Sequence, residues 1–197
     1  MPTVDYVSLD AHAVRTSIDV VLRATSEDLS KPTPCRAWTL YGLLAHMATQ
    51  HYGFAAASRG EGEPEIWKLR DLGDDPVKAY ITSAEHVLAA FAEEGVTERE
   101  FPLPEFGAGL SFPGHQAISF HFIDYVVHTW DVAKSLGTTV AFPPEVLEAA
   151  QSVAQVVPTG PVRLAPGAAF AADIPWSTDN PLDNIVAHLG RSPHWPN

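Results

Sequence analysis

The amino-acid sequence predicts a mainly α-helical protein, with a four-helix bundle over residues 1–138 and a small helical and irregular extension over residues 139–197 packed on it. Four long segments repeat apolar residues at helical spacing, and a long connection separates the third from the fourth. The chain has 197 residues and is 46% hydrophobic, which is enough for a sizeable core.

The first two helices are separated by a proline-rich segment. The first is expected from about Ser8 to Leu29, where apolar residues form one stripe. Residues 31–36 contain two prolines and end it. Thr39 is then placed to cap a second helix that runs to about Ser58.

The third and fourth helices have clear start and stop signals. The dipeptide Asp75-Pro76 opens the third, which ends near Gly95. An irregular connection over residues 96–112 follows, and we expect its phenylalanines to line an apolar pocket wall: Phe101, Phe106 and Phe112. The fourth helix is expected from about Pro113 to Leu136, with Gly137 ending it.

The extension is predicted to hold two shorter helices. The first starts at Pro143-Pro144 and runs to about Val157. The region 158–175 is rich in Pro, Gly and Ala, and Val162 to Leu164 is expected to be extended. Asn180-Pro181 starts a last helix that ends at Gly190.

The charge and composition of the chain indicate which kinds of binding partner and metal ligand to expect. The net charge is −12 and no Lys/Arg cluster is present, which argues against nucleic acid. No secretion signal and no membrane-spanning run is apparent, so a soluble cytoplasmic protein without membrane contact is expected. With Cys35 as its single cysteine, the chain can bind a metal only through histidine and carboxylate.

Three side chains that can bind a metal share one face of the fourth helix. At ~100° per residue, His121, Asp124 and His128 lie within roughly 60° of one another. Their neighbours are large and apolar, so the helix is expected to be largely buried, where an unpaired charge is costly. A buried aspartate beside two histidines favours a bound cation.

A second helix is expected to complete the site. His46 lies in the apolar segment Leu40–Met47 and predicts a triad of His46, Asp124 and His128. Zn²⁺ suits these donors best, while Ni²⁺, Fe²⁺ and Mn²⁺ are also acceptable. Three protein ligands leave positions open for water or substrate. Two alternatives need no metal: a local ion pair between Asp124 and His128, four residues apart, or His121 and His128 as hydrogen-bonded core residues.

His121 is assigned a catalytic role beside the triad, either orienting the carboxylate or moving a proton, although a fourth ligand is the alternative. The other histidines have no partner pattern and are expected at the surface, with His51 facing away from His46: His12, His51, His86, His115, His188 and His194. Gln50, one turn beyond His46, has two open placements: in the cavity, or at the surface as a satisfied amide. Cys35 is more consistent with packing than with a nucleophile.

Four segments resemble the actinobacterial DinB-like proteins related to the N-terminal domain of mycothiol-dependent maleylpyruvate isomerase: Thr33–Leu40, Leu43–Met47, Asp124–Ala133 and Leu189–Trp195. The resemblance implies a DinB-like four-helix bundle in which His46, Asp124 and His128 bind a divalent metal. It also implies that zinc activates mycothiol or another small thiol as co-substrate. Where the isomerase has glutamate, this chain has Asp124.

These observations predict a metal-dependent intracellular enzyme, a thiol transferase or isomerase that acts on a small molecule as a monomer or homodimer. Two other interpretations stay open. One is a non-catalytic protein that binds a small molecule in the bundle cavity. The other is a structural or stress-response dimer that binds metal incidentally.

Overall fold

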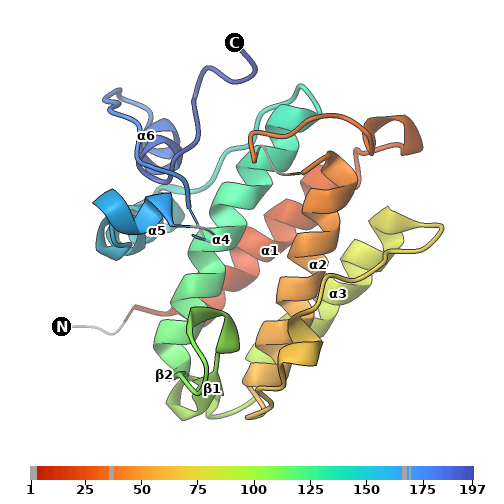
Figure 1. Cartoon of the computed structure of the whole chain (residues 1–197), viewed down its shortest axis with the longest axis vertical. Coiled ribbons are helices and arrows are strands. Elements are labelled where there is room, and N and C mark those ends of the chain that lie inside the picture. The colour runs from red at the N-terminus through yellow and green to blue at the C-terminus, as the bar shows by residue number, and fades with distance from the viewer. Residues whose placement is uncertain (1–3, 36–37, 166–167, 169) are drawn as a thin grey trace.

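Four helices form the body of the molecule in the computed structural model, which describes residues 4–35, 38–165, 168 and 170–197. They are α1 (Tyr6–Val21), α2 (Leu40–Ala57), α3 (Pro76–Phe91) and α4 (Gly114–Ser135). Figure 1 shows them side by side, with α4 between the other bundle helices and the C-terminal part of the chain. The predicted mainly α-helical class is confirmed.

Side-chain caps define where three of the bundle helices begin. The carboxylate of Asp5 accepts a hydrogen bond from the Ser8 amide at the start of α1. Thr39 caps α2 and Asp75 caps α3, as the sequence predicts. These caps satisfy amides that the first helical turn leaves without a partner.

The first helix ends earlier than the sequence predicts. Helix α1 stops at Val21, and the apolar Leu22 that follows it is 58% exposed. A short 3₁₀ helix then covers Ser26–Asp28 and begins with a capping box, in which Asp28 accepts hydrogen bonds from the amide and hydroxyl of Thr25. This local cap competes with continuation of α1, so the predicted end at Leu29 is wrong.

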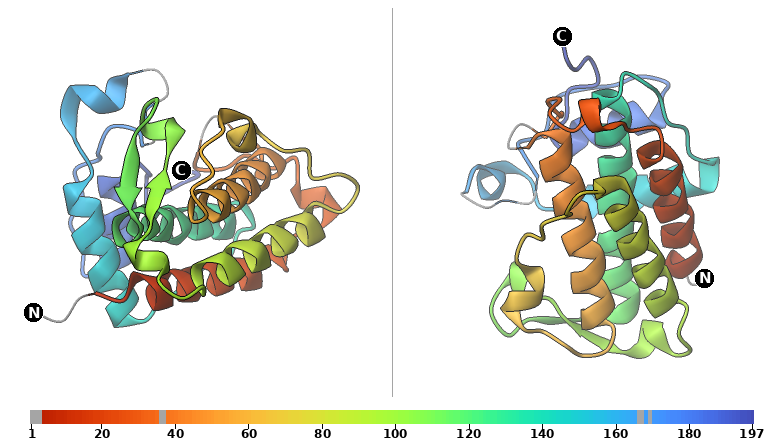
Figure 2. Two further views of the ribbon diagram at one scale, coloured as in Figure 1. Left: turned by 90° about the horizontal axis from the view of Figure 1, so that it is seen from below. Right: turned by 90° about the vertical axis from the view of Figure 1, so that its right-hand side faces the viewer.

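The core is centred on α4. Seventeen of its 22 residues are buried, because α1 and α2 pack on it from one side and the C-terminal extension from the other. Figure 2 shows this central position from two further directions. Polar residues on such a helix must therefore find partners inside the protein.

The connection before α4 contains a hairpin that the sequence did not reveal. Strand β1 (Glu100–Pro102) pairs antiparallel with β2 (Ser111–Pro113), with Phe101 opposite Phe112. Short 3₁₀ helices flank and join these strands at Val96–Glu98 and Pro104–Phe106. Strands of three residues that end in proline are too short for an alternating pattern to stand out.

The C-terminal extension covers one side of the bundle. Helix α5 (Pro144–Val156) packs on α4, and α6 (Pro181–His188) packs on α5 (Figure 1). Residues Gly160–Leu164 form a 3₁₀ helix, so the predicted extended piece at Val162 to Leu164 is wrong. Pro161 after Gly160 is compatible with the first turn of a helix, which explains the difference.

Two further short features complete the description. Pro64–Trp67 forms a 3₁₀ helix between α2 and α3. Within the part of the chain that the structure describes, no helix is both long and apolar enough to cross a bilayer.

Candidate metal centre

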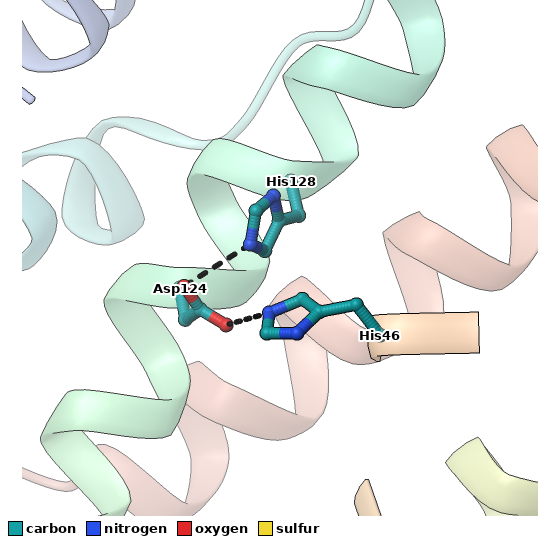
Figure 3. Close-up of side chains that lie close together, drawn as sticks. All are labelled: His46, Asp124 and His128. Atoms are coloured by element: carbon teal, nitrogen blue, oxygen red, sulfur yellow. Dashed lines mark ion pairs between the residues drawn. The ribbon is translucent and has the colours of Figure 1, made fainter. Parts of the chain in front are cut away.

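The three predicted ligands lie together at the contact between α2 and α4. Ligand atoms of His46, Asp124 and His128 all fall within 4.8 Å of one another. Asp124 faces both rings, with its Oδ1 3.3 Å from Nε2 of His128 and its Oδ2 4.0 Å from Nε2 of His46 (Figure 3). Among the described residues, no fourth histidine, cysteine or carboxylate joins this group.

Local structure explains how each ligand is placed. Asp124 and His128 are four residues apart on α4, so their side chains lie one above the other. His46 projects from α2 and stacks on Trp38, with ring centroids 4.4 Å apart and planes at 23°. Because Trp38 immediately precedes the Thr39 cap, the start of α2 and the orientation of His46 are fixed together.

The group is open to solvent on one side only. The side chains of His46 and Asp124 are 23% and 25% exposed, whereas His128 is 4% exposed. Two imidazoles and a carboxylate are donors suited to Zn²⁺ and related divalent ions. Three converging donors with an accessible side fit a metal that keeps positions for an exchangeable ligand.

The charges of the group are strongly coupled. Burial raises the pKa of Asp124, but His128 and then His46 outweigh it and bring the pKa well below its usual range. Burial lowers the pKa of His128, yet Asp124 and Asp131 together raise it to about 9. Burial and the positive charge of His128 lower the pKa of His46 to about 4. Without a metal, a protonated His128 therefore supplies the cation between the two carboxylates.

Asp131 is a partner of the site that sequence reasoning missed. Its Oδ2 lies 3.0 Å from Nδ1 of His128, on the side of the ring away from Asp124. The same oxygen accepts hydrogen bonds from Arg191 in the C-terminal extension. A carboxylate on the second nitrogen of a histidine ligand fixes the ring and its tautomer. The three-residue spacing from His128 was the available signal for Asp131, whereas Arg191 was marked only by the resemblance of the segment that contains it.

His121 does not take the position predicted for it. It is fully buried, with Nδ1 2.6 Å from Oδ1 of Asp10 and Nε2 3.2 Å from Nδ1 of His51. Both ring nitrogens are thus engaged away from the triad, and the predicted catalytic role beside Asp124 does not match these contacts. The three side chains share one face of α4 as predicted. However, the rise of the helix over the three residues between His121 and Asp124 places His121 in a different layer of the bundle from the triad.

His51 is also placed differently from the prediction of a surface residue. It faces away from His46 as expected, but it is fully buried because α2 is covered on most sides. Burial lowers the pKa of His51 well below its usual range and raises that of Asp10. Of the other histidines, His188 is half-buried. The remaining four are exposed, as predicted: His12, His86, His115 and His194.

The hairpin lies one helical turn from the ligands on both helices. Gln50, four residues after His46, donates a hydrogen bond to Oε2 of Glu105 at 2.9 Å. Phe106 stacks on Phe120, four residues before Asp124, with ring centroids 5.2 Å apart. Glu105 is exposed as a whole residue, yet desolvation of its carboxyl raises the pKa to about 7, against the opposing effect of the hydrogen bond from Gln50.

The predicted phenylalanine wall is divided by the structure. Phe106 and Phe112 contact each other and Phe120, and Phe106 is 45% exposed. Phe101 instead lies fully buried in the core beside Phe91. These contacts place a partly exposed aromatic surface next to Glu105.

Cys35 has the character of a packing residue. Burial raises the pKa of its thiol to about 11, against the opposing charge of Arg191. The thiol is therefore protonated at neutral pH, which does not favour a nucleophilic role.

Comparison with known proteins identifies the family. Residues 11–133 match the family model described as the mycothiol maleylpyruvate isomerase N-terminal domain, and the chain belongs to this family. The resemblance predicted from the four sequence segments is thus confirmed.

Two mycobacterial proteins resemble this chain over most of its length. Two uncharacterized proteins of Mycobacterium tuberculosis, from strains CDC 1551 / Oshkosh and ATCC 25618 / H37Rv, are each 29% identical over 168 residues. These alignments cover 85% of this chain and 87% of each relative.

Solved structures show the same fold. The crystal structure of the mycothiol-dependent maleylpyruvate isomerase superposes with a TM-score of 0.60 at 15% identity, covering 78% of this chain and 70% of that one. A histidine-to-alanine mutant of the isomerase gives a TM-score of 0.58 at 14% identity, with the same coverage.

Proposed function

We propose that this chain is a metal-dependent enzyme that uses a low-molecular-weight thiol, of the mycothiol type, to isomerise or modify a small electrophilic substrate. The observation that carries the proposal is the convergence of His46, Asp124 and His128 on a half-open point between α2 and α4. Membership of a family described by a mycothiol-dependent isomerase supports the use of a thiol.

The donor set fits Zn²⁺ best, and it also accepts Ni²⁺, Fe²⁺ or Mn²⁺. When bound, such an ion supplies a Lewis acid that lowers the pKa of a thiol reaching its open positions. The chain itself then needs no nucleophile, which agrees with the protonated state of Cys35. His46 and Asp124 present the accessible edge, while Asp131 holds His128 from behind.

The hairpin provides what the reaction needs beside the ligands. The Glu105 carboxylate is suited to accept the proton that the thiol releases, and its hydrogen bond from Gln50 holds it in place. Phe106 and Phe120 offer an apolar surface for the substrate. A thiolate held at this point would form a C–S bond to an activated double bond of the substrate, with the electron pair of that bond moving onto the conjugated carbonyl group. Rotation about the resulting single bond and expulsion of the thiolate would restore the double bond in the other geometry, whereas a transferase would keep the C–S bond and return the proton from Glu105 to the product.

Metal analysis combined with a thiol-dependent assay tests this proposal. Protein purified without a His-tag or chelator should carry about one equivalent of metal, and His46→Ala, Asp124→Ala and His128→Ala should each lose it. His115→Ala, which removes an exposed histidine from the start of α4, is the matched control and should retain it.

The same samples should then be supplied with mycothiol-type thiols and electrophilic double-bond substrates. Turnover is expected only with both thiol and metal. Full metal occupancy in His46→Ala would refute the site, and metal binding without any thiol-dependent turnover would favour a non-catalytic binding protein.

A further inference from the structure

The C-terminal segment Gly190–Trp195 reaches the metal centre from outside the bundle, through the single side chain of Arg191. We propose that this segment locks the ligand His128 in its binding orientation, with Arg191 and Asp131 as positioning residues. The inference rests on the proposed metal site and assigns a role to the last part of the chain, which the family match over residues 11–133 does not include.

One oxygen connects the segment to the ligand. Oδ2 of Asp131 accepts from Nη2 of Arg191 at 3.2 Å and from Nε at 3.4 Å, and Nδ1 of His128 lies 3.0 Å from the same atom. Asp131 is fully buried and Arg191 is 4% exposed. With Nδ1 held in this way, Nε2 of His128 faces Asp124, which is the direction a metal ligand requires.

The backbone around Arg191 is built to deliver this side chain. Gly190 follows the end of α6 with a left-handed φ of 82°, and a Cβ there would lie 2.7 Å from the carbonyl oxygen of Ala171. The Arg191 amide then donates to the carbonyl of Val186, and its Nη1 donates to the carbonyl of Leu189. These contacts hold Arg191 in place independently of its hydrogen bonds to Asp131.

Stability alone does not account for this arrangement. A buried ion pair contributes little net stability compared with apolar residues, because its desolvation offsets the attraction between the charges. Moreover, Oδ1 of Asp131 has no hydrogen-bond partner within the described residues, so the carboxylate is not satisfied as fully as a purely structural pair would be. Its other oxygen is shared between Arg191 and the ligand His128.

A second contact of the same segment supplies a matched control. Nζ of Lys134 on α4 donates to the carbonyl oxygen of Pro193 at 3.1 Å, and it ties the segment to the bundle without touching Asp131. Lys134→Met removes this bond and keeps an aliphatic side chain beside Trp130. If the segment acted only by general anchoring, loss of this contact would affect the metal as much as loss of Arg191.

The test measures the Zn²⁺ dissociation constant of the full chain by competition with a chelator. Arg191→Gln and Asp131→Asn are expected to weaken Zn²⁺ binding by about 10- to 100-fold, as for other residues that orient histidine ligands. Lys134→Met should stay within about twofold of the wild type, and Arg191→Lys should fall between them because it keeps the charge but not the paired donors.

The double variant Asp131→Asn with Arg191→Gln covers the case in which a single variant leaves a buried charge and fails to fold. It removes both charges at nearly constant shape and should still bind Zn²⁺ at least about tenfold more weakly. Folded variants that bind Zn²⁺ as tightly as the wild type would overturn the inference alone. A wild-type protein that binds no divalent metal would overturn the proposed function and this inference together.

Discussion

A buried polar layer lies beneath the metal centre and consists of Asp10, His121 and His51. Within this layer, His51 contributes to the way the stability of the fold depends on pH. His51 lies in a place where a charged imidazole is poorly solvated, and burial lowers its pKa well below the usual value. The folded state therefore leaves His51 neutral under mildly acidic conditions, whereas the unfolded chain takes up a proton near the ordinary histidine pKa of about 6.5.

We expect the free energy of unfolding to fall as the pH drops below about 6.5, by at most ~1.4 kcal/mol per pH unit for this one proton. His51→Asn keeps a hydrogen-bonding group near the position of Nδ1 but does not titrate, so the stability of this variant should depend less on pH in this range. Urea denaturation between about pH 5 and 7.5 measures both slopes.

The raised pKa of Asp10 acts in the opposite direction, because it favours proton uptake by the folded state. Both proteins contain Asp10, so the difference between their slopes isolates His51. Parallel pH profiles would show that His51 is not the residue responsible.

Residue spacing predicted that Asp124 and His128 lie together, because the geometry of this pair is local. Asp124 and His128 are one turn apart, and a helix fixes their relation whatever surrounds it. The contacts of His121 could not be derived in this way, since Asp10 is 111 positions away in sequence. Whether a histidine on a helix faces a cavity or another polar group depends on the neighbouring helices, which periodicity does not identify.

At the scale of elements, the β1–β2 hairpin is where specificity and proton transfer are expected to reside. Its 3₁₀ turn carries Glu105 and Phe106 onto residues one turn from the ligands of both helices. Because the hairpin contacts both α2 and α4, we expect its position to depend on the substrate or thiol that binds between these helices.

Glu105→Gln tests the proton-accepting role at this element. The variant should retain its metal but lose about 100-fold in thiol-dependent kcat/KM, within the usual contribution of a general base. Because the carboxyl has its pKa raised to about 7, wild-type activity should increase as the pH rises through that value, and this rise should disappear in the variant.

Glu100→Gln, which changes an exposed carboxylate in strand β1 of the same hairpin, is the matched control. It should leave both the rate and the pH profile unchanged. Equal losses in the two variants would indicate a general effect of hairpin charge, and unchanged kinetics in Glu105→Gln would exclude it as the base.

The starts of α2 and α3 were predicted well, whereas the end of α1 and the β1–β2 hairpin were not. Thr39 and Asp75-Pro76 mark the starts of α2 and α3 because a capping side chain acts on its own first turn. The end of α1 depends on the capping box of Thr25 with Asp28, which the apolar stripe concealed. The hairpin depends on pairing across residues 103–110, and short segments interrupted by prolines give little periodic signal.

At the scale of the whole molecule, the bundle and the extension share α4. Helix α5 packs on α4 and α1, and Arg191 and Lys134 join the last segment to the bundle. The division at residue 138 stays a prediction, but these contacts imply that the two parts depend on each other.

We expect a single cooperative unfolding transition in which helical circular dichroism and tryptophan fluorescence coincide. Trp38 and Trp67 report the bundle side, whereas Trp176 and Trp195 report the extension. Two separate transitions, with the fluorescence of the last two tryptophans changing first, would show that the extension unfolds independently.

The long-range features of the molecule were the least accessible to sequence reasoning. The acidic balance and the lack of basic clusters argue against nucleic acid as a partner without any knowledge of the fold, and this stays a prediction. The ending Gly190–Trp195 was recognisable only as a resemblance. Its physical meaning required the fold, which brings Arg191 to an aspartate 60 positions earlier.

The stacking of Trp38 on His46 gives the protein a spectroscopic reporter of its own site. An indole 4.4 Å from a ligand ring lies close enough for its emission to respond to an ion held there. Ions with partly filled d shells, such as Ni²⁺, should quench this emission, while Zn²⁺ has a filled shell and should not. Fluorescence should thus distinguish Zn²⁺ from ions that quench the indole, without any label and with Trp38→Phe as the blank.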